Sequence, residues 1–231
     1  MRAGRAALAA LLCAAFAVPA FAGDDLAAAC PGAEAWNKAH PDDTEEARSR
    51  RDAARTFTDP ALRTELAARV AKDQAARNAM LADLSSRQAN EAVLAVDEDN
   101  VKWLYGLVTS KGLPTAAQVG EQGVLDAWLL TQHADRAPKF QAALLPAFEQ
   151  RHAAGEFNAS DLARFTDRIL KAQGKPQRYG TQFPPEAMRR KYFGLPDEAS
   201  VREVDTHRRE LGVMPLADYA CMMSFYRLGP R

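Results

Sequence analysis

The stretch from Gly120 to Ala134 constrains the fold most, because its apolar residues cover nearly the whole circumference of a helix: Val124, Leu125, Ala127, Trp128, Leu129 and Leu130. A helix that is apolar on nearly all sides has to be surrounded by other elements. Elsewhere the alternating pattern of a β-strand is nearly absent, and Ala, Leu, Arg, Glu and Gln dominate. We therefore predict an all-α, single-domain multi-helix bundle with this stretch as its central helix.

Local signals place the neighbouring elements. Thr58-Asp59-Pro60 predicts a helix start, with a capping side chain followed by a proline, and the apolar spacing continues to about Ser86. A second helix is predicted from Asp99 to Ser110. After the central helices, Pro176, Gly180, Pro184 and Pro185 predict a Pro-rich loop over residues 175–185.

The N-terminus has the order of an export signal. Met1, Arg2 and Arg5 form a basic start, an apolar run follows to Ala17, and Ala20-Phe21-Ala22 is a small-x-small cleavage site. We predict a signal peptide over residues 1–22, cleavage after Ala22, and a periplasmic or secreted product. Residues 23–57 are interpreted as an N-terminal helical extension that packs loosely or pairs through Trp36, and residues 58–231 as an α-helical domain.

Charge and hydropathy exclude two classes of partner. Removing Arg2 and Arg5 leaves 28 of the 30 basic residues against 30 acidic ones. A nearly neutral chain lacks the basic face that nucleic acid or anionic lipid requires, so we expect no nucleic-acid partner. No segment after the signal approaches the roughly 20 apolar residues of a membrane helix, so we expect no integral membrane segment after cleavage.

Two cysteines are left after signal cleavage, Cys30 and Cys221. In an oxidising compartment they can form one disulfide bond that closes a long loop. The alternative is two buried thiols that behave as small apolar side chains. Both interpretations stay open, because spacing in the sequence gives no distance between the two Cα atoms.

Charged residues interrupt two apolar helix faces. Asp73 and Arg77 fall within the stripe that Leu66, Val70, Leu81 and Leu84 form, and Gln74 lies at its edge; Arg208 falls among Val201, Val204 and Leu211. A charge in such a stripe has to be paired or hydrated, because an unpaired buried charge is too costly to persist. We expect Asp73 and Arg77, four residues apart, to pair.

His133 is the candidate general base, because the unperturbed pKa of histidine lies near neutrality. The alternative is a partly buried histidine whose hydrogen bonds are satisfied by Asp126 or by a main-chain carbonyl. The four histidines lack the short spacing of metal ligands, no nucleophile elbow is present, and no glycine-rich loop could hold phosphate. We predict no metal and no cofactor.

The loop after the central helices is the candidate for ligand contact. Gln177, Tyr179, Thr181 and Gln182 offer uncharged donors and acceptors on a loop stiffened by proline, which suits a peptide or a sugar. The alternative is a rigid connection whose glutamines satisfy main-chain groups that no helix covers.

Several short motifs occur in a specific order. They are Asp73-Gln74 with Arg77, Gln132-His133-Ala134-Asp135, Asp167-Arg168, Tyr179-Gly180-Thr181-Gln182, and Arg208-Arg209 with Gly212. In this order they resemble a bacterial family of unknown function, domain-of-unknown-function family 6624, over about Leu66 to Tyr219. The resemblance implies kinship of fold and no particular activity.

These observations lead to one set of predicted binding residues: Asp73, Gln74, Arg77, Gln132, His133, Gln177, Tyr179, Gln182 and Arg208. We expect Asp73, Arg77, His133, Tyr179, Gln182 and Arg208 to form one shared polar cluster. The predicted function is a periplasmic binding or interaction module for a protein, peptide or small-molecule ligand. The alternative is a hydrolase-like enzyme with His133 as general base and an arginine that stabilises negative charge.

Overall fold

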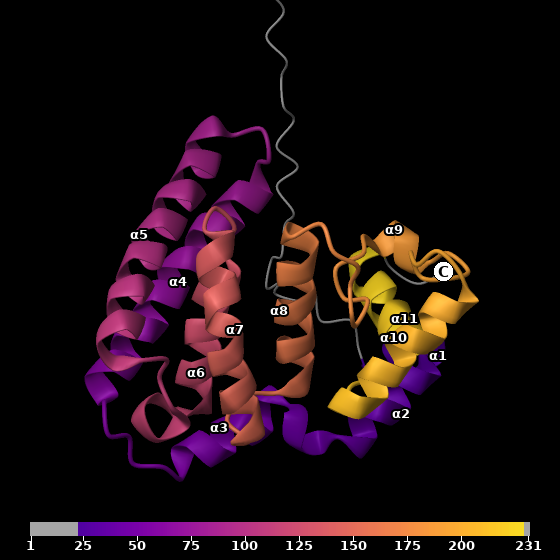
Figure 1. Cartoon of the computed structure of the whole chain (residues 1–231), viewed down its shortest axis with the longest axis horizontal. Helices are drawn as coiled ribbons and strands as arrows, with labels where there is room; N and C mark the ends of the chain where they lie inside the picture. Colours follow the sequence, from indigo (N-terminus) through magenta and orange to yellow (C-terminus); the bar gives the residue numbers. More distant parts are fainter. Residues whose placement is uncertain (1–22, 229–231) are drawn as a thin grey trace, which may run out of the picture.

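The computed structural model describes residues 23–228, so the predicted signal peptide lies outside the described residues. Every regular element in this range is a helix, which confirms the all-α single-domain prediction (Figure 1). In chain order these are α1 (Gly23–Ala29), α2 (Pro31–Ala39), the short 3-10 helix η1 (Pro41–Asp43), α3 (Glu45–Ala53), α4 (Pro60–Ala82), α5 (Arg87–Lys111), α6 (Ala116–Gln132), α7 (Pro138–Ala153), α8 (Ala159–Ala172), α9 (Pro185–Met188), α10 (Glu198–Leu211) and α11 (Leu216–Leu228). Among the described residues, no helix is both long enough and apolar enough to span a membrane.

Helix α4 begins where the sequence predicts and ends earlier. The Asp59 side chain accepts a hydrogen bond from the Leu62 N–H group at 3.0 Å, and Pro60 is the first helical residue. The helix stops at Ala82 because the Asp83 carboxylate accepts hydrogen bonds from the N–H and hydroxyl groups of Ser85 at 3.0 and 2.6 Å. Such a local side-chain turn competes with helical hydrogen bonds.

The predicted start of the next helix at Asp99 was wrong, because α5 begins at Arg87. Ser86 caps it, accepting a hydrogen bond from the Ala89 N–H group at 3.2 Å. Val93 and Val96 are buried and extend the apolar face by more than one turn before Asp99. The earlier start matters for the site, because it brings Asp97 onto this helix.

Helix α6 is the central helix, and it is broken near its start. Gly120 has φ 77° and ψ 168°, and a Cβ atom there would lie 2.4 Å from the Asp52 carboxylate and 2.2 Å from Arg63. Asp52, in α3, accepts hydrogen bonds from the N–H groups of Glu121 and Gln122 at 2.8 and 3.0 Å. The carboxylate of another helix thus caps the main part of α6, so loose packing is wrong for residues 45–53. Trp36 packs against the second core described below, as the alternative interpretation expected.

The described residues form two apolar cores, and apart from α8 itself the helices that build them lie mainly on either side of α8 in the view of Figure 1. The first core is formed mainly by α4 to α8 and includes Leu66, Leu104, Val124, Phe148 and Phe165. The second is formed by the N-terminal helices with the last three helices, and it includes Leu26, Ala33, Met188, Leu216 and Phe225. Helices α1 and α2 thus complete a core whose other half lies near the C-terminus.

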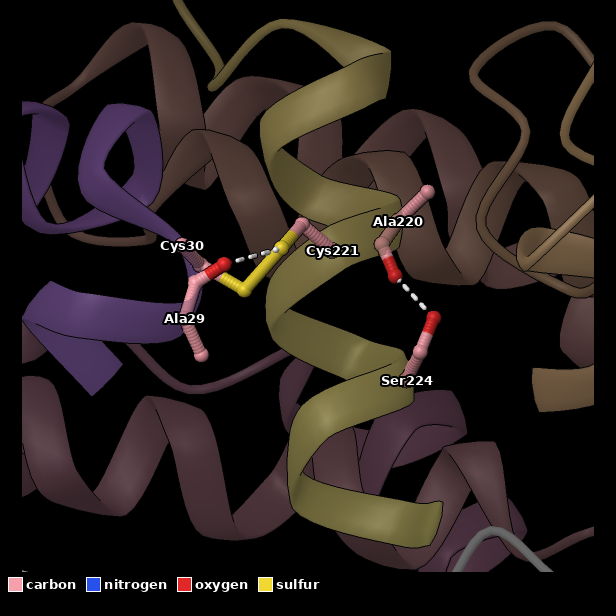
Figure 2. Close-up of a disulfide and its surroundings, with 5 residues drawn as sticks. All are labelled: Ala29, Cys30, Ala220, Cys221 and Ser224. Carbon is pink, nitrogen blue, oxygen red and sulfur yellow. Dashed lines mark hydrogen bonds between the residues drawn. A yellow bond between two sulfur atoms is a disulfide. The ribbon is translucent and has the colours of Figure 1, made fainter. Parts of the chain in front are cut away.

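A disulfide bond joins Cys30, directly before α2, to Cys221 in α11 (Figure 2). Their Cα atoms are 5.8 Å apart, although the two cysteines are 191 positions apart in the sequence. Of the two interpretations left open by the sequence, the structure contains the bridge. It links the first helices to the last across the second core.

We predict that removing this bridge destabilises the protein by up to roughly 5 kcal/mol, the chain-entropy value for so long a loop. The comparison is denaturant unfolding of wild type and of the Cys30→Ser/Cys221→Ser double variant. Under reducing conditions the two proteins should have similar unfolding midpoints, since neither then has a bridge. Equal stability of wild type and the double variant in the absence of reductant would contradict the prediction.

Candidate functional site

A polar cluster lies where α4, α5 and the end of α6 meet. Arg77 Nε donates a hydrogen bond to Asp73 Oδ1 at 3.2 Å, and its terminal nitrogen donates to Asp97 at 2.5 Å. His133 Nδ1 lies 2.9 Å from Asp73 Oδ2 and 3.0 Å from Arg77 Nε. Gln74 donates to Asp73 at 2.8 Å. The structure therefore brings four of the predicted residues together and confirms the expected Asp73–Arg77 pair.

Asp73 is the anion at the centre of this cluster. Its side chain is 1% exposed, and burial alone would favour the protonated form. The hydrogen bond from His133 and the charge of Arg77 outweigh burial, so the pKa of Asp73 is lowered. An ionised carboxylate accepts hydrogen bonds, and this favours the His133 tautomer with the proton on Nδ1.

His133 is a buried residue, 3% exposed, at the C-terminal end of α6. Burial is the main cause of its lowered pKa, and the nearby guanidinium of Arg77 lowers it further. The imidazole is therefore neutral at neutral pH. Its partner is Asp73 rather than the expected Asp126, whose carboxylate instead accepts a hydrogen bond from Gln122 at 2.8 Å.

A second ion pair adjoins the cluster. Arg168 in α8, with a side chain 8% exposed, donates to Asp135 Oδ1 from Nε at 2.8 Å. Three carboxylates, those of Asp73, Asp97 and Asp135, thus lie near two guanidinium groups. One carboxylate is in excess as long as His133 is neutral.

Asp97 is the carboxyl group that carries this excess. Burial raises its pKa to about 7 against the attraction of Arg77, and the negative charges of Asp73 and Asp135 raise it further. Asp73 holds its proton less tightly because it has more donors around it. At neutral pH, Asp97 is therefore the group in the cluster that exchanges a proton.

A groove of about 540 Å³ begins at Asp97. Part of its wall is apolar and aromatic, with the rings of Tyr105 and Phe140 6.0 Å apart between centroids, and the charged residues Glu98, Lys102 and Arg136 also line it. Tyr105 is 62% exposed, which is unusual for so large a side chain. The lining residues are Asp97, Glu98, Val101, Lys102, Tyr105, Ala134, Arg136, Ala137 and Phe140.

The loop around Tyr179 forms a separate cluster around the buried carboxylate of Asp167. That carboxylate accepts hydrogen bonds from the N–H groups of Arg178, Tyr179 and Thr181 at 2.7, 2.9 and 2.8 Å. The Thr181 hydroxyl adds a fourth at 2.9 Å. The carboxylate of a helix residue therefore holds the loop in place.

The amide side chains of this loop also bond within the protein. Gln177 Oε1 accepts a hydrogen bond from the Gln182 N–H group at 2.7 Å, and Gln182 Nε2 donates to the Arg164 carbonyl at 3.3 Å. Arg208 donates to the Tyr179 carbonyl at 2.5 Å. These contacts favour the rigid-connection interpretation for Gln177 and Gln182.

The expected single cluster is therefore two clusters, with Asp73, Gln74, Arg77 and His133 in one and Gln177, Tyr179, Gln182 and Arg208 in the other. The physical reason is that Asp167 and Arg168 are consecutive on α8 and point in directions about 100° apart. Gln132 belongs to neither cluster. It is buried, and its side-chain oxygen has no hydrogen-bond donor among the described residues.

Sequence reasoning missed Asp97 as a site residue, because the start of α5 was placed after it. The signal was a carboxylate next to the apolar position Val96, with Asn100 and Leu104 buried further along the helix. Sequence reasoning also did not assign anchoring roles to Asp135, Asp167 and Arg168, although the motifs contain them. Asp135 and Arg168 pair with each other, and Asp167 accepts hydrogen bonds from the Tyr179 loop, so each of the three has its partner in another part of the chain.

No group of three or more metal-binding side chains gathers in the described part of the chain. A model of a known protein family matches residues 60–228, and the family is described as a family of unknown function, DUF6624. The chain belongs to this family. The match begins at the first residue of α4 and includes both clusters, so both lie within the DUF6624 region. No curated protein and no solved structure matches the chain.

We predict that the Asp73–Arg77 pair is a stabilising element of the fold. Asp73→Ala and Arg77→Ala should each cost about 3 to 5 kcal/mol, because each leaves a buried charge without its partner. The double variant should cost clearly less than the sum of the two single variants. Denaturant unfolding measures all three.

The matched control is the exposed Arg87–Glu91 pair of α5, which has the same i,i+4 spacing and side chains 90% and 61% exposed. Glu91→Ala should cost under about 1 kcal/mol. Costs for Asp73→Ala and Arg77→Ala as small as that of the control would show that the cluster is effectively hydrated.

A second prediction concerns the pH dependence of stability. The raised pKa of Asp97 means that the folded protein keeps a proton that the unfolded chain releases above a pH of about 4. The contribution of this group to stability therefore falls as pH rises from about 4 to about 7. In Asp97→Asn this contribution should disappear, while the amide oxygen can still accept a hydrogen bond from Arg77.

The measurement is denaturant unfolding across this pH range. Glu91→Gln, which neutralises an exposed carboxylate of the same helix, should keep the wild-type pH dependence. An Asp97→Asn profile parallel to that of wild type would contradict the raised pKa.

Proposed function

We propose that this protein is an exported binding module that holds a ligand with a cationic group and an aromatic or apolar body in the Tyr105–Phe140 groove. The observation that carries the proposal is the excess carboxylate of Asp97 at the end of that groove. Export and a periplasmic or secreted location are supported by the order of basic, apolar and small residues over the first 22 positions.

The charge of the cluster supports a cationic ligand. Arg168 pairs with Asp135, and Arg77 is shared between Asp73 and Asp97, so three carboxylates of the described cluster share two guanidinium groups. An ammonium group at Asp97 would balance the charge and form a charge-assisted hydrogen bond. It would also lower the pKa of Asp97, since a nearby cation favours the ionised form.

The walls of the groove support an aromatic or apolar body. Tyr105 and Phe140 present ring surface to the solvent side of α5 and α7, and aromatic rings attract both apolar groups and cations. The volume of about 540 Å³ lies within the range of small-molecule sites. A side chain of a peptide or a small aromatic amine has the matching chemistry.

A hydrolase with His133 as general base has less support. The imidazole is buried, its Nδ1 contacts Asp73 and Arg77, and His133 is not among the described residues that line the groove. A general base needs to reach the proton that it removes. The cluster is better suited to positioning a charge than to activating water.

The experiment compares 2-phenylethylamine with 2-phenylethanol, which has a similar shape and no charge. Purified protein should bind the amine more tightly, as measured by calorimetric titration. Between pH about 6 and about 8 the affinity for the amine should rise about tenfold, because Asp97 ionises around pH 7 while the amine stays protonated. The affinity for the alcohol should not change over this range.

Two variants test the site. Asp97→Asn should remove the pH dependence of amine affinity and most of the preference for the amine. Phe140→Ala should weaken the binding of both compounds, because it removes part of the groove wall. Glu91→Gln, on the same helix and away from the groove, should bind like wild type. Equal affinity for amine and alcohol in wild type, at every pH tested, would refute the proposed ligand class.

A further inference from the structure

Arg208 of α10 is a buried cation in the second cluster, with 2% of its surface exposed. Its Nε donates to the Met214 carbonyl at 2.5 Å, and one terminal nitrogen donates to the Tyr179 carbonyl at 2.5 Å. The guanidinium carbon lies 4.6 Å from the centre of the Tyr219 ring. These contacts fix the position of the group, and both hydrogen-bond acceptors are neutral main-chain carbonyls.

The positive charge of Arg208 has no carboxylate partner within residues 23–228. Asp205 and Asp167 act on it as charges without forming an ion pair, and burial lowers its pKa. A guanidinium group has five N–H groups, and two of them donate to carbonyls, so three have no described protein acceptor. A buried charge in this state is costly unless something else balances it.

A cavity of about 370 Å³ lies beside this guanidinium, where the second core meets α8. Besides Arg208, its lining includes Trp36, Arg164, Thr181, Met214, Met222 and Met223. Arg164 is paired with Asp161, so its charge is already balanced. Arg208 is therefore the cation in this wall whose charge is not balanced by an ion pair.

We propose that this cavity binds a small organic carboxylate with an apolar body, and that Arg208 is the residue that holds the carboxylate. The planar guanidinium matches the two oxygens of a carboxylate, which would supply both the missing charge and the missing acceptors. This site is separate from the Tyr105–Phe140 groove and does not depend on the function proposed for it.

The rest of the cavity favours a single negative charge on an apolar body. Methionine side chains adapt their shape to the group that they contact, and three of them line the cavity. Trp36 adds an aromatic surface, stacked on His40 with ring centroids 3.9 Å apart. Free organic acids and peptide C-termini share this chemistry.

The primary experiment is calorimetric titration of the purified protein with N-acetyl-leucine and with N-acetyl-leucinamide. The two compounds differ in the carboxylate alone. We expect the acid to bind at least about tenfold more tightly than the amide, since a charge-assisted pair with a buried guanidinium is lost in the amide. A short peptide ending in leucine, with a free or an amidated C-terminus, is tested in parallel.

The relative affinities identify the source of the carboxylate. Tighter binding of the free-ended peptide than of N-acetyl-leucine assigns the site to chain ends, and the opposite order assigns it to free acids. Either order supports the site. Equal affinity for the acid and the amide, or no binding of either acid at millimolar concentration, would overturn the proposal.

Two variants locate the site. Arg208→Lys keeps the charge and loses the planar pair of donors, so the acid should bind at least about tenfold more weakly. Ser160→Glu places a negative charge on an exposed residue of the cavity wall. It should weaken the binding of the acid and leave the affinity for the amide unchanged. Ser160→Glu also provides the test if Arg208→Lys fails to fold, which circular dichroism will show.

The matched control is Ala92→Glu, which adds the same charge on the exposed face of α5, away from the cavity. It should bind the acid like wild type. If Ser160→Glu and a folded Arg208→Lys both bound the acid with unchanged affinity, the carboxylate would not lie at Arg208.

Discussion

The burial of α6 on nearly every side is the constraint on which the rest of the structure depends. A helix end leaves main-chain groups without helical partners, and inside a protein these need partners from other elements. At the start of α6 the partner is Asp52 of α3, and at its end Gln141 donates to the carbonyls of Thr131 and Gln132 at 3.1 Å each. Elements distant in the sequence are thereby fixed against both ends of the central helix.

The candidate site depends on where the C-terminal end of α6 lies. Because α6 stops at Gln132, His133 lies at the edge of the core and needs a partner for its Nδ1, which Asp73 of α4 provides. Asp73 in turn is stabilised by Arg77, and Arg77 also reaches Asp97. Burial and the neighbouring carboxylates raise the pKa of Asp97 to about 7, and this residue lines the groove.

Helix α8 connects the two halves of the molecule through two adjacent residues. Arg168 pairs with Asp135 beside the first cluster, while Asp167 holds the Tyr179 loop through four hydrogen bonds. That loop, in turn, receives Arg208 from α10. The disulfide bond between Cys30 and Cys221 belongs to the second core (Figure 2). The excess negative charge at Asp97 and the unbalanced positive charge at Arg208 therefore occur in separate parts of the molecule.

Sequence patterns alone were enough to predict the all-α class, the central helix, the start of α4 and the pairing of Asp73 with Arg77. All of these depend on local periodicity, capping or spacing within one helix, and such signals lie in neighbouring residues. Helix packing was needed to show that His133 contacts Asp73, that Asp97 belongs to the same cluster and that Arg208 lies in another one. It also decided that Cys30 meets Cys221. These contacts join residues that are far apart in the chain, and which of them meet depends on how the helices pack, a property that no single segment encodes.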